Sequence, residues 1–226
     1  MNKDEYIAKF SENDAVGWEA IDEILDEIYK GKEPRHYATT LKYMLGGEDP
    51  LDGVSIYDTN QQQFHRHIIS YGMSELYYNP ESVENEFSGW GFEFNMRVTP
   101  FSEDENSGDA KNEPIWVINL MQNLARYVFD SKNFFQAYHF IPTDGPIRFD
   151  TDTKLSAIIF VPDPIIDRIN TPNGMVEMLC MFGITDDEYN WLLLEPTAQR
   201  VKELADIIAK DNPMFITDLT RKFSYV

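Results

Sequence analysis

The chain has 226 residues, of which 39 are Asp or Glu and 19 are Lys or Arg, so its formal net charge at pH 7 is −20. This charge excludes a nucleic-acid binder that holds phosphates through clustered Lys and Arg, and it favours a positively charged partner. Hydrophobic residues make up 42% of the chain and aromatic residues 14%, which predicts a folded core. Because no Gly-, Ser- or Pro-rich linker interrupts the sequence, we expect residues 1–226 to form a single domain.

Neither a targeting segment nor a membrane span is evident. Residues 1–13 lack the apolar segment of a secretory signal, and the longest apolar stretches, 157–161 and 178–182, are far shorter than the ~20 residues that span a bilayer. Cys180 is the single cysteine, which excludes an internal disulfide, and its apolar neighbours indicate a buried side chain. These features predict a soluble, cytoplasmic protein.

The first predicted element is a helix. Apolar residues from Trp18 to Tyr29 recur every three or four positions with acidic residues between them, which is typical of an amphipathic helix. Residues 41–45 suggest a second, short helix. Residues 54–57 and 67–71 are rich in β-branched and aromatic side chains and predict strands.

Residues 90–98 alternate between apolar and polar side chains. Phe92, Phe94 and Met96 would lie on a buried face, and Glu93, Asn95 and Arg97 on a solvated face. This pattern is typical of an antiparallel sheet.

An acidic stretch and a helix follow. Residues 102–113 have almost no apolar side chains and predict a mobile acidic loop. Asn112 is a suitable helix cap, and Pro114 suits the first turn of a helix that extends to about Asp130.

The last third combines buried strands with helices. Residues 155–161 and 175–184 are nearly continuous apolar runs that predict central strands. Thr185 and Glu188 have the spacing of a capping box at the start of a helix that ends near Leu194. A helix over 198–210 and a strand over 214–219 complete the chain. The mixed order of elements predicts an α+β fold with a mixed, largely antiparallel sheet.

Candidate catalytic groups have structural explanations. His65 and His67 share one face of a predicted strand, as two metal ligands would, but a third ligand is not evident nearby, so we expect no metal and no other cofactor. Glu75, Glu93, Asp49 and Asp52 could supply an acid and a base, but Asp49 and Asp52 also suit a turn. No motif for a nucleophile or a phosphate loop is present.

Aromatic side chains gather in residues 133–141 (NFFQAYHFI), which include Phe134, Phe135, Tyr138 and Phe140. Two interpretations remain open at this point. The segment is either a strand buried on both faces or an edge strand whose free backbone groups capture a strand of a partner.

Six short segments resemble the Suppressor of fused (SUFU) domain family, in the family's order. They are residues 45–52 (LGGEDPLD), 69–77 (ISYGMSELY), 89–97 (GWGFEFNMR), 120–129 (LMQNLARYVF), 171–174 (TPNG) and 216–219 (ITDL). The resemblance extends from about Gly17 to Arg221.

This resemblance implies an α+β domain that binds proteins and has no catalytic activity. Animal members hold a transcription factor of the Hedgehog pathway in the cytoplasm, between this domain and a second, C-terminal domain. We expect that second domain to be absent here. Single-domain members resemble bacterial SUFU-like proteins, for which a role as immunity proteins against polymorphic toxins is implied, and an acidic binder suits a basic toxin.

The resemblance also implies roles for individual residues. The tyrosine of the LARYVF segment, a partner contact in animal members, corresponds to Tyr127, and the acidic residue before the following histidine is replaced by Tyr138, which precedes His139. The family's His-Trp-His is His65-Arg66-His67 here. The predicted partner-binding residues are therefore Tyr127, Phe135, Tyr138, His139 and Phe140.

The leading hypothesis is a non-enzymatic domain that binds a basic protein, either a toxin domain or a regulator, through an edge strand near residues 133–141. One alternative is a hydrolase that uses Glu75 or Glu93 with His65 and His67, which requires these side chains to converge in a cavity. Another is an intracellular regulator of a transcription factor.

Overall fold

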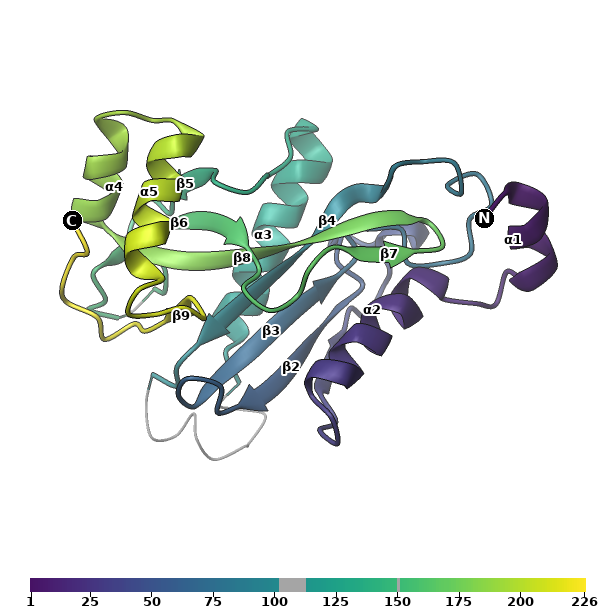
Figure 1. Ribbon diagram of the computed structural model, residues 1–226, viewed down its shortest axis with the longest axis horizontal. Coiled ribbons are helices and arrows are strands. Elements are labelled where there is room, and N and C mark those ends of the chain that lie inside the picture. The colour runs from purple at the N-terminus through teal and green to yellow at the C-terminus, as the bar shows by residue number, and fades with distance from the viewer. Residues whose placement is uncertain (102–112, 150) are drawn as a thin grey trace.

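The computed structural model describes residues 1–101, 113–149 and 151–226. In these residues nine strands form one sheet with the order β1-β2-β3-β4-β8-β6-β5, to which β7 adds beside β8 and β9 beside β4 (Figure 1). The strands are β1 (Arg35–Ala38), β2 (Gly53–Thr59), β3 (His65–Tyr71), β4 (Phe87–Val98), β5 (Phe140–Pro142), β6 (Leu155–Pro162), β7 (Ile169–Thr171), β8 (Gly174–Thr185) and β9 (Ile216–Thr217). The helices are α1 (Lys3–Lys9), α2 (Val16–Ile28), α3 (Ile115–Ser131), α4 (Asp186–Leu193) and α5 (Ala198–Ile208), with a 3₁₀ turn, η1 (Tyr43–Leu45).

Most strand pairs are antiparallel, whereas β4 runs parallel to both β8 and β9. The α+β fold with a mixed, largely antiparallel sheet is therefore confirmed. The two long apolar segments form β6 and β8, and β8 lies at the centre of the sheet between β4 and β6.

Helices cover both faces of the sheet (Figure 1). α3 packs on one face, where its Met121 and Val128 belong to the largest apolar cluster, together with Phe94 and Phe160 of the sheet. α2 covers one end of the opposite face, and α4 and α5 cover its other end. Because successive side chains of β6 point to opposite faces, this strand contributes to the α3 cluster and to the α4–α5 cluster.

The prediction that one face of residues 90–98 is solvated is wrong. Glu93, Asn95 and Arg97 are all completely buried. Each has polar partners from distant segments: Arg97 pairs with Asp163 at 2.7 Å, and Asn95 bonds to His67. Buried polar groups are tolerated when they are hydrogen-bonded, so an alternating pattern does not require a solvated face.

Most other predicted elements are confirmed, with different ends. α2, α3, α5 and strands β2, β3, β6 and β8 occupy the expected segments. The capping box of α4 is present, since Thr185 accepts from the Glu188 N–H and Glu188 accepts from the Thr185 N–H. The short helix expected over 41–45 is only the 3₁₀ turn η1, and the last strand contains two residues rather than six.

The expected acidic loop and Asn112, the expected cap of the following helix, fall in residues 102–112, which lie outside the described residues. Glu113, the end of that segment, is buried and forms an ion pair with Arg35. Pro114 occupies the N-cap position of α3, one residue before its first turn.

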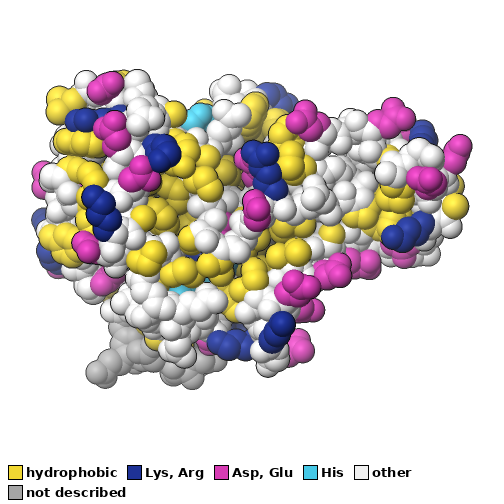
Figure 2. Space-filling model, viewed as in Figure 1, with side chains coloured by type: hydrophobic (Ala, Val, Ile, Leu, Met, Phe, Trp, Pro, Cys, Tyr) yellow, Lys and Arg dark blue, Asp and Glu magenta, His cyan; other side chains and the backbone are white. Residues whose placement is uncertain are grey.

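Acidic side chains line the outer side of α2. Glu19, Glu23, Asp26 and Glu27 are exposed there, and acidic side chains form a row at the lower right of the face shown in Figure 2. This row places part of the net negative charge away from α4 and α5.

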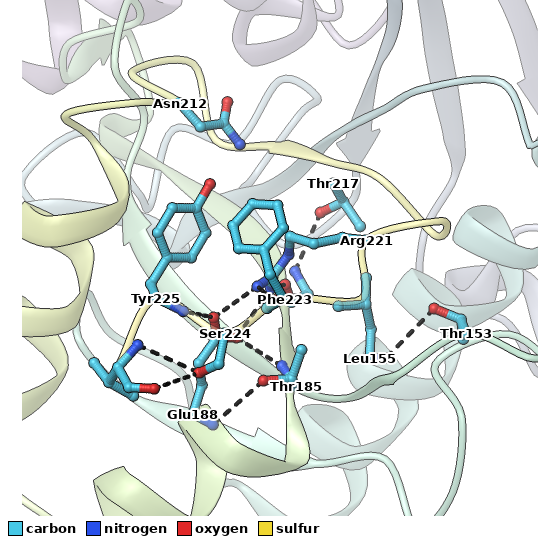
Figure 3. Close-up of polar contacts among 12 residues, drawn as sticks. Thr153, Leu155, Thr185, Glu188, Asn212, Thr217, Arg221, Phe223, Ser224 and Tyr225 are labelled. Atoms are coloured by element: carbon cyan, nitrogen blue, oxygen red, sulfur yellow. Dashed lines mark hydrogen bonds and ion pairs between the residues drawn. The ribbon is translucent and has the colours of Figure 1, made fainter.

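The last residues of the chain are fixed by a buried ion pair (Figure 3). The Arg221 guanidinium donates to both carboxylate oxygens of Glu188, at 2.6 and 2.9 Å, and to the Gly183 carbonyl at 3.0 Å. The Tyr225 N–H also donates to Glu188, at 3.0 Å. Glu188 therefore caps α4 and holds the C-terminal segment against it.

Candidate functional site

The edge strand expected near residues 133–141 is much shorter than predicted. β5 contains Phe140, Ile141 and Pro142 and pairs with β6 at the edge of the sheet, whereas residues 133–139 form a loop and a turn. Tyr138 interrupts an extended course, because its φ of +67° lies in the left-handed region. The interpretation as a fully buried strand is therefore wrong for this segment, and the edge strand covers only its end.

The outer side of β5 carries backbone groups that pair with no further strand among the described residues. The His139 carbonyl accepts from the Phe160 N–H, and the Thr143 N–H donates to the Ser156 carbonyl, so residues at odd positions face β6. Because antiparallel strands alternate in this respect, the backbone groups of Phe140 and Pro142 point away from β6. Pro142 has no N–H, which leaves the Phe140 N–H and two carbonyls for another strand.

All five predicted partner-binding residues line one groove beside this edge. Its volume is about 420 Å³, and Tyr127 of α3, Phe135, Tyr138, His139 and Phe140 contribute to its wall. The opposite wall comes from Pro196, Thr197 and Ala198 at the start of α5. The structure thus places residues from three separate segments around one cavity.

These five side chains differ in exposure. Phe135 is only 6% exposed and stacks on Phe160 with ring centroids 4.5 Å apart, so it anchors the groove to the core. Tyr127 is 49% exposed and lies against Phe135 at 5.8 Å. Tyr138 and Phe140 are half-buried, and His139 is exposed.

Sequence reasoning missed part of the groove. Phe134 is 49% exposed and lines the cavity beside Asn133, although the sequence predicts only its neighbour Phe135 as a partner-binding residue. Residues 196–198 reach the groove because α4 and α5 fold back over β6, and their sequence carries no signal for this. The groove contains no Asp, Glu, Lys or Arg among its lining residues.

The side chains proposed for a hydrolase do not converge. Among the described residues, no hydrogen bond or ion pair joins Glu75 or Glu93 to His65 or His67. Glu93 accepts from the Ser70 hydroxyl and from the Gly72 and Ser74 N–H groups, and burial raises the pKa of its carboxyl. Its hydrogen bonds hold the end of β3 against β4.

His67 is a structural residue. Its Nδ1 lies 2.5 Å from the Tyr29 hydroxyl and its Nε2 lies 3.0 Å from Asn95 Oδ1. Complete burial lowers the pKa of His67 to about 3, so the ring is neutral at pH 7. His65 Nδ1 bonds the Gln63 carbonyl at 2.8 Å. The pair fills and hydrogen-bonds one face of the sheet.

The structure also bears on a metal site, on the Asp49/Asp52 pair, on Cys180 as a nucleophile and on a membrane span. Within residues 1–101, 113–149 and 151–226, His, Cys, Asp and Glu side chains do not cluster in groups of three or more that suit a metal ion. Asp49 pairs with Arg126 and Asp52 accepts from Tyr77, as residues of a fixed loop. Burial raises the pKa of the Cys180 thiol to about 12, which disfavours a nucleophilic thiolate. None of the helices described is both long and apolar enough to cross a membrane.

Sequence comparison identifies relatives for most of the chain. The family model for the Suppressor of fused protein (SUFU) matches residues 47–222. The Suppressor of fused homologs of Homo sapiens and Mus musculus are each 31% identical to this chain over 201 residues. The alignment covers 83% of this chain but 39% of either mammalian protein, so the chain spans well under half of their length.

Solved structures support the same relationship. The chain matches the Sufu–Fu complex crystal structure with a TM-score of 0.81 and 28% identity over 93% of both chains. It matches Drosophila Suppressor of Fused with the same TM-score and identity, over 95% of this chain and 52% of that protein. A SUFU homolog from Neisseria gonorrhoeae FA 1090, at 16% identity and a TM-score of 0.56, shares the fold. The family model, the mammalian relatives and the fold agree: this chain belongs to the Suppressor of fused family.

Proposed function

We propose that this chain is a non-enzymatic protein-binding domain that acts in the cytoplasm and captures an extended segment of a partner at the edge of β5. The observation that carries the proposal is the groove that joins the free edge of β5 to Tyr127, Tyr138 and Phe140. A family member has been crystallised in a complex with a second protein, Fu. That complex supports protein binding as the general activity.

The shape and chemistry of the groove favour a short apolar strand. Phe140 and Pro142 offer one N–H and two carbonyls, enough for a brief pairing. The aromatic walls supply apolar contact area for alternate side chains of the captured segment, as in other cases of strand addition. Affinity would come from the groove, since aromatic residues in partly buried pockets dominate binding energies.

Charge has a different role in this proposal. The groove is uncharged, but the chain has a net charge of −20 and exposed acidic residues along α2. A long-range negative potential accelerates encounters with a basic protein more than it strengthens the final contacts. The partner is therefore expected to carry an apolar strand next to a basic surface.

Two classes of protein meet this description. One is a basic toxin domain, such as a nuclease, which this chain would neutralise as an immunity protein. The other is a DNA-binding regulator, which it would sequester. The negative charge supports both.

The proposal is tested by measuring partner affinity with groove variants. The products of neighbouring genes are screened by pull-down, and the dissociation constant of each captured protein is then measured for Tyr138→Ala and Tyr127→Ala. If these residues are binding hot spots, each variant weakens binding by about 2 kcal/mol, which is roughly 30-fold. Phe149→Ala, which removes an 82% exposed ring outside the groove, is the matched control.

Thermal unfolding separates a binding role from a structural one. Unchanged affinity of folded Tyr127→Ala and Tyr138→Ala would contradict the groove as the binding site. Loss of a toxin's lethality on co-expression with this chain distinguishes the immunity role from the regulatory role.

A further inference from the structure

A second cavity lies on the other side of the end of α3. Its volume is about 380 Å³, and it is open to solvent. Its lining comes from η1, Pro50 and Asp52, residues 72–79, the beginning of β4 and Phe129. It shares no lining residue with the groove beside β5. α3 separates the two sites, since Tyr127 lines the groove and Phe129 lines this cavity.

Aromatic rings form much of the wall of this cavity. Phe129 lies 5.0 Å from Tyr43 and 5.6 Å from Trp90, between ring centroids, and Tyr77 contributes a further ring. The faces of such rings carry negative potential and attract cations.

The backbone of the floor is closely packed. Gly72 has a φ of +135°, and a Cβ there would lie 2.8 Å from the Pro50 carbonyl oxygen and the Asp52 nitrogen. A Cβ on Gly89, whose φ is +56°, would lie 2.7 Å from the Met73 carbonyl oxygen. Glycine at both positions lets the loop before β2 and the beginning of β4 pack closely against residues 72–75, so the cavity has a fixed base.

The chain's own lysines already lie against these rings. Lys42 Nζ is 4.0 Å from the centroid of Tyr77 and 3.8 Å from Asp52 Oδ2, and it bonds the Tyr77 hydroxyl. Lys132 Nζ lies 5.7 Å from the centroid of Trp90. Neither lysine lines the cavity itself, but their positions show that the surrounding groups attract positive charge.

Two carboxylates line the cavity. Asp52 accepts from the Tyr77 hydroxyl at 2.5 Å. Glu75 Oε2 accepts from Asn79 Nδ2 at 2.9 Å, and no hydrogen bond or ion pair to Oε1 occurs among the described residues. Asp52 already has Lys42 within 3.8 Å, so Glu75 is the carboxylate that an occupant would have to compensate. A wholly apolar occupant would bury Glu75 without a cationic partner, and an anion would be repelled by it. The lining therefore selects a cation.

The rim indicates that the cation comes with a protein. Leu41, Met44 and Leu45, at and beside η1, are 51%, 73% and 69% exposed. Exposed apolar side chains next to a small aromatic pocket with a carboxylate are typical of a protein contact surface, where they exclude water around a central anchor.

We propose that this cavity receives an arginine side chain of a partner protein. The guanidinium would stack on the aromatic wall and donate to Glu75, and the apolar rim would contact the partner around it. Arginine fits better than lysine because its planar group stacks on rings and pairs with a carboxylate through two N–H groups. This site does not depend on the proposed groove beside β5.

The experiment titrates the full chain with N-acetyl-arginine methylamide, which mimics an arginine within a polypeptide. Binding is followed by NMR through the indole N–H signals of the four tryptophans, and Trp90 is assigned with Trp90→Phe. We expect a saturable shift of the Trp90 signal. The uncharged isostere N-acetyl-citrulline methylamide should bind at least about tenfold more weakly than the arginine probe. This factor is equivalent to ~1.4 kcal/mol of binding free energy.

Matched variants locate the interaction. Glu75→Gln should weaken binding of the arginine probe about fivefold or more, because it removes the charged acceptor. Glu23→Gln removes the same charge from the outer side of α2 and should leave the affinity unchanged. Far-UV circular dichroism and thermal unfolding confirm that each variant is folded.

Three results would overturn the proposal. The first is the absence of a Trp90 shift, or equal binding of the citrulline probe. The second is an equal effect of Glu75→Gln and Glu23→Gln, which would indicate attraction to the overall charge. The third is tighter binding of free arginine than of the blocked probe, which would indicate a small-molecule site.

Discussion

His67 is completely buried and lies in a polar cluster with Tyr29, Asn95 and Asp163. Its side chain is an internal hydrogen-bonding group, because Tyr29 and Asn95 occupy both ring nitrogens. The neutral ring suits a site beside Arg97, whose charge also lowers the pKa of His67. The cluster therefore contributes to stability only while the imidazole stays unprotonated.

This arrangement predicts a pH dependence of folding. The pKa of His67 is about 3 in the folded chain and near 6.5 in the unfolded chain, so the unfolded state binds more protons between these values. The contribution of neutral His67 to the free energy of unfolding is fully present above pH 6.5. It is lost as the pH falls, by up to ~1.4 kcal/mol per pH unit. Between pH 7 and 5, the unfolding free energy of the wild type should fall about 2 kcal/mol more than that of His67→Gln. Equal losses in urea titrations would contradict this assignment.

Arg221 and Glu188 form a pair whose side chains are 5% and 0% exposed. Removing one member leaves a buried charge without a partner, so Arg221→Met should lower the unfolding free energy by about 3–5 kcal/mol. Arg126→Met, at an exposed pair with Asp49 whose N–O distance is 2.9 Å, should cost about 1 kcal/mol or less. Urea denaturation measures both values, and similar costs would show that the buried pair contributes little.

α4 begins at a capping box that the sequence predicted and the structure confirms. Thr185→Ala removes the oxygen that accepts from the Glu188 N–H and should destabilise the chain by about 1 kcal/mol. Thr185→Ser retains the hydroxyl and is the control. If both variants unfold at the same denaturant concentration, the lost methyl group rather than the cap determines the effect.

β5 shows how tertiary structure overrides an element-level prediction. Its aromatic residues predicted a strand over residues 133–141, yet β5 itself contains only Phe140, Ile141 and Pro142. Phe135 turns into the core onto Phe160, and the positive φ of Tyr138 ends the extended course. The packing of Phe135 on α3 and β6 thus sets where β5 begins, and the remaining segment forms the wall of the groove.

The negative charge of the whole molecule predicts a kinetic effect. Glu23→Lys with Glu27→Lys changes two exposed charges of α2, remote from the lining of the β5 groove. For a basic partner, the association rate constant at low salt should fall roughly 3- to 10-fold, and the dissociation rate constant should stay nearly constant. Stopped-flow measurements at low and high salt check this, since high salt should remove the difference. A change confined to dissociation would instead place α2 in the interface.

Family membership connects this chain to proteins more than twice the aligned length, because the alignment covers 39% of the human relative. The groove beside β5 and the aromatic cavity are both built entirely from residues of this chain. The assignment of residues 1–226 to a single domain stays a prediction.

Elements whose interactions are local can be predicted from the sequence. The spacing of apolar residues in α2 and the capping box of Thr185 and Glu188 depend on contacts between residues three or four positions apart. Family membership can also be inferred from the sequence, because six ordered segments resemble the SUFU domain and the family model matches residues 47–222.

Only the tertiary structure decided which polar residues are buried and which aromatic residues share a cavity. Arg97 looked solvent-facing because its partner, Asp163, lies 66 positions away. Tyr127, Phe140 and Ala198 meet only because the helices pack on the sheet. A polar side chain can be buried when the folded chain supplies its hydrogen bonds, and alternation along a strand cannot reveal partners that folding brings from distant segments.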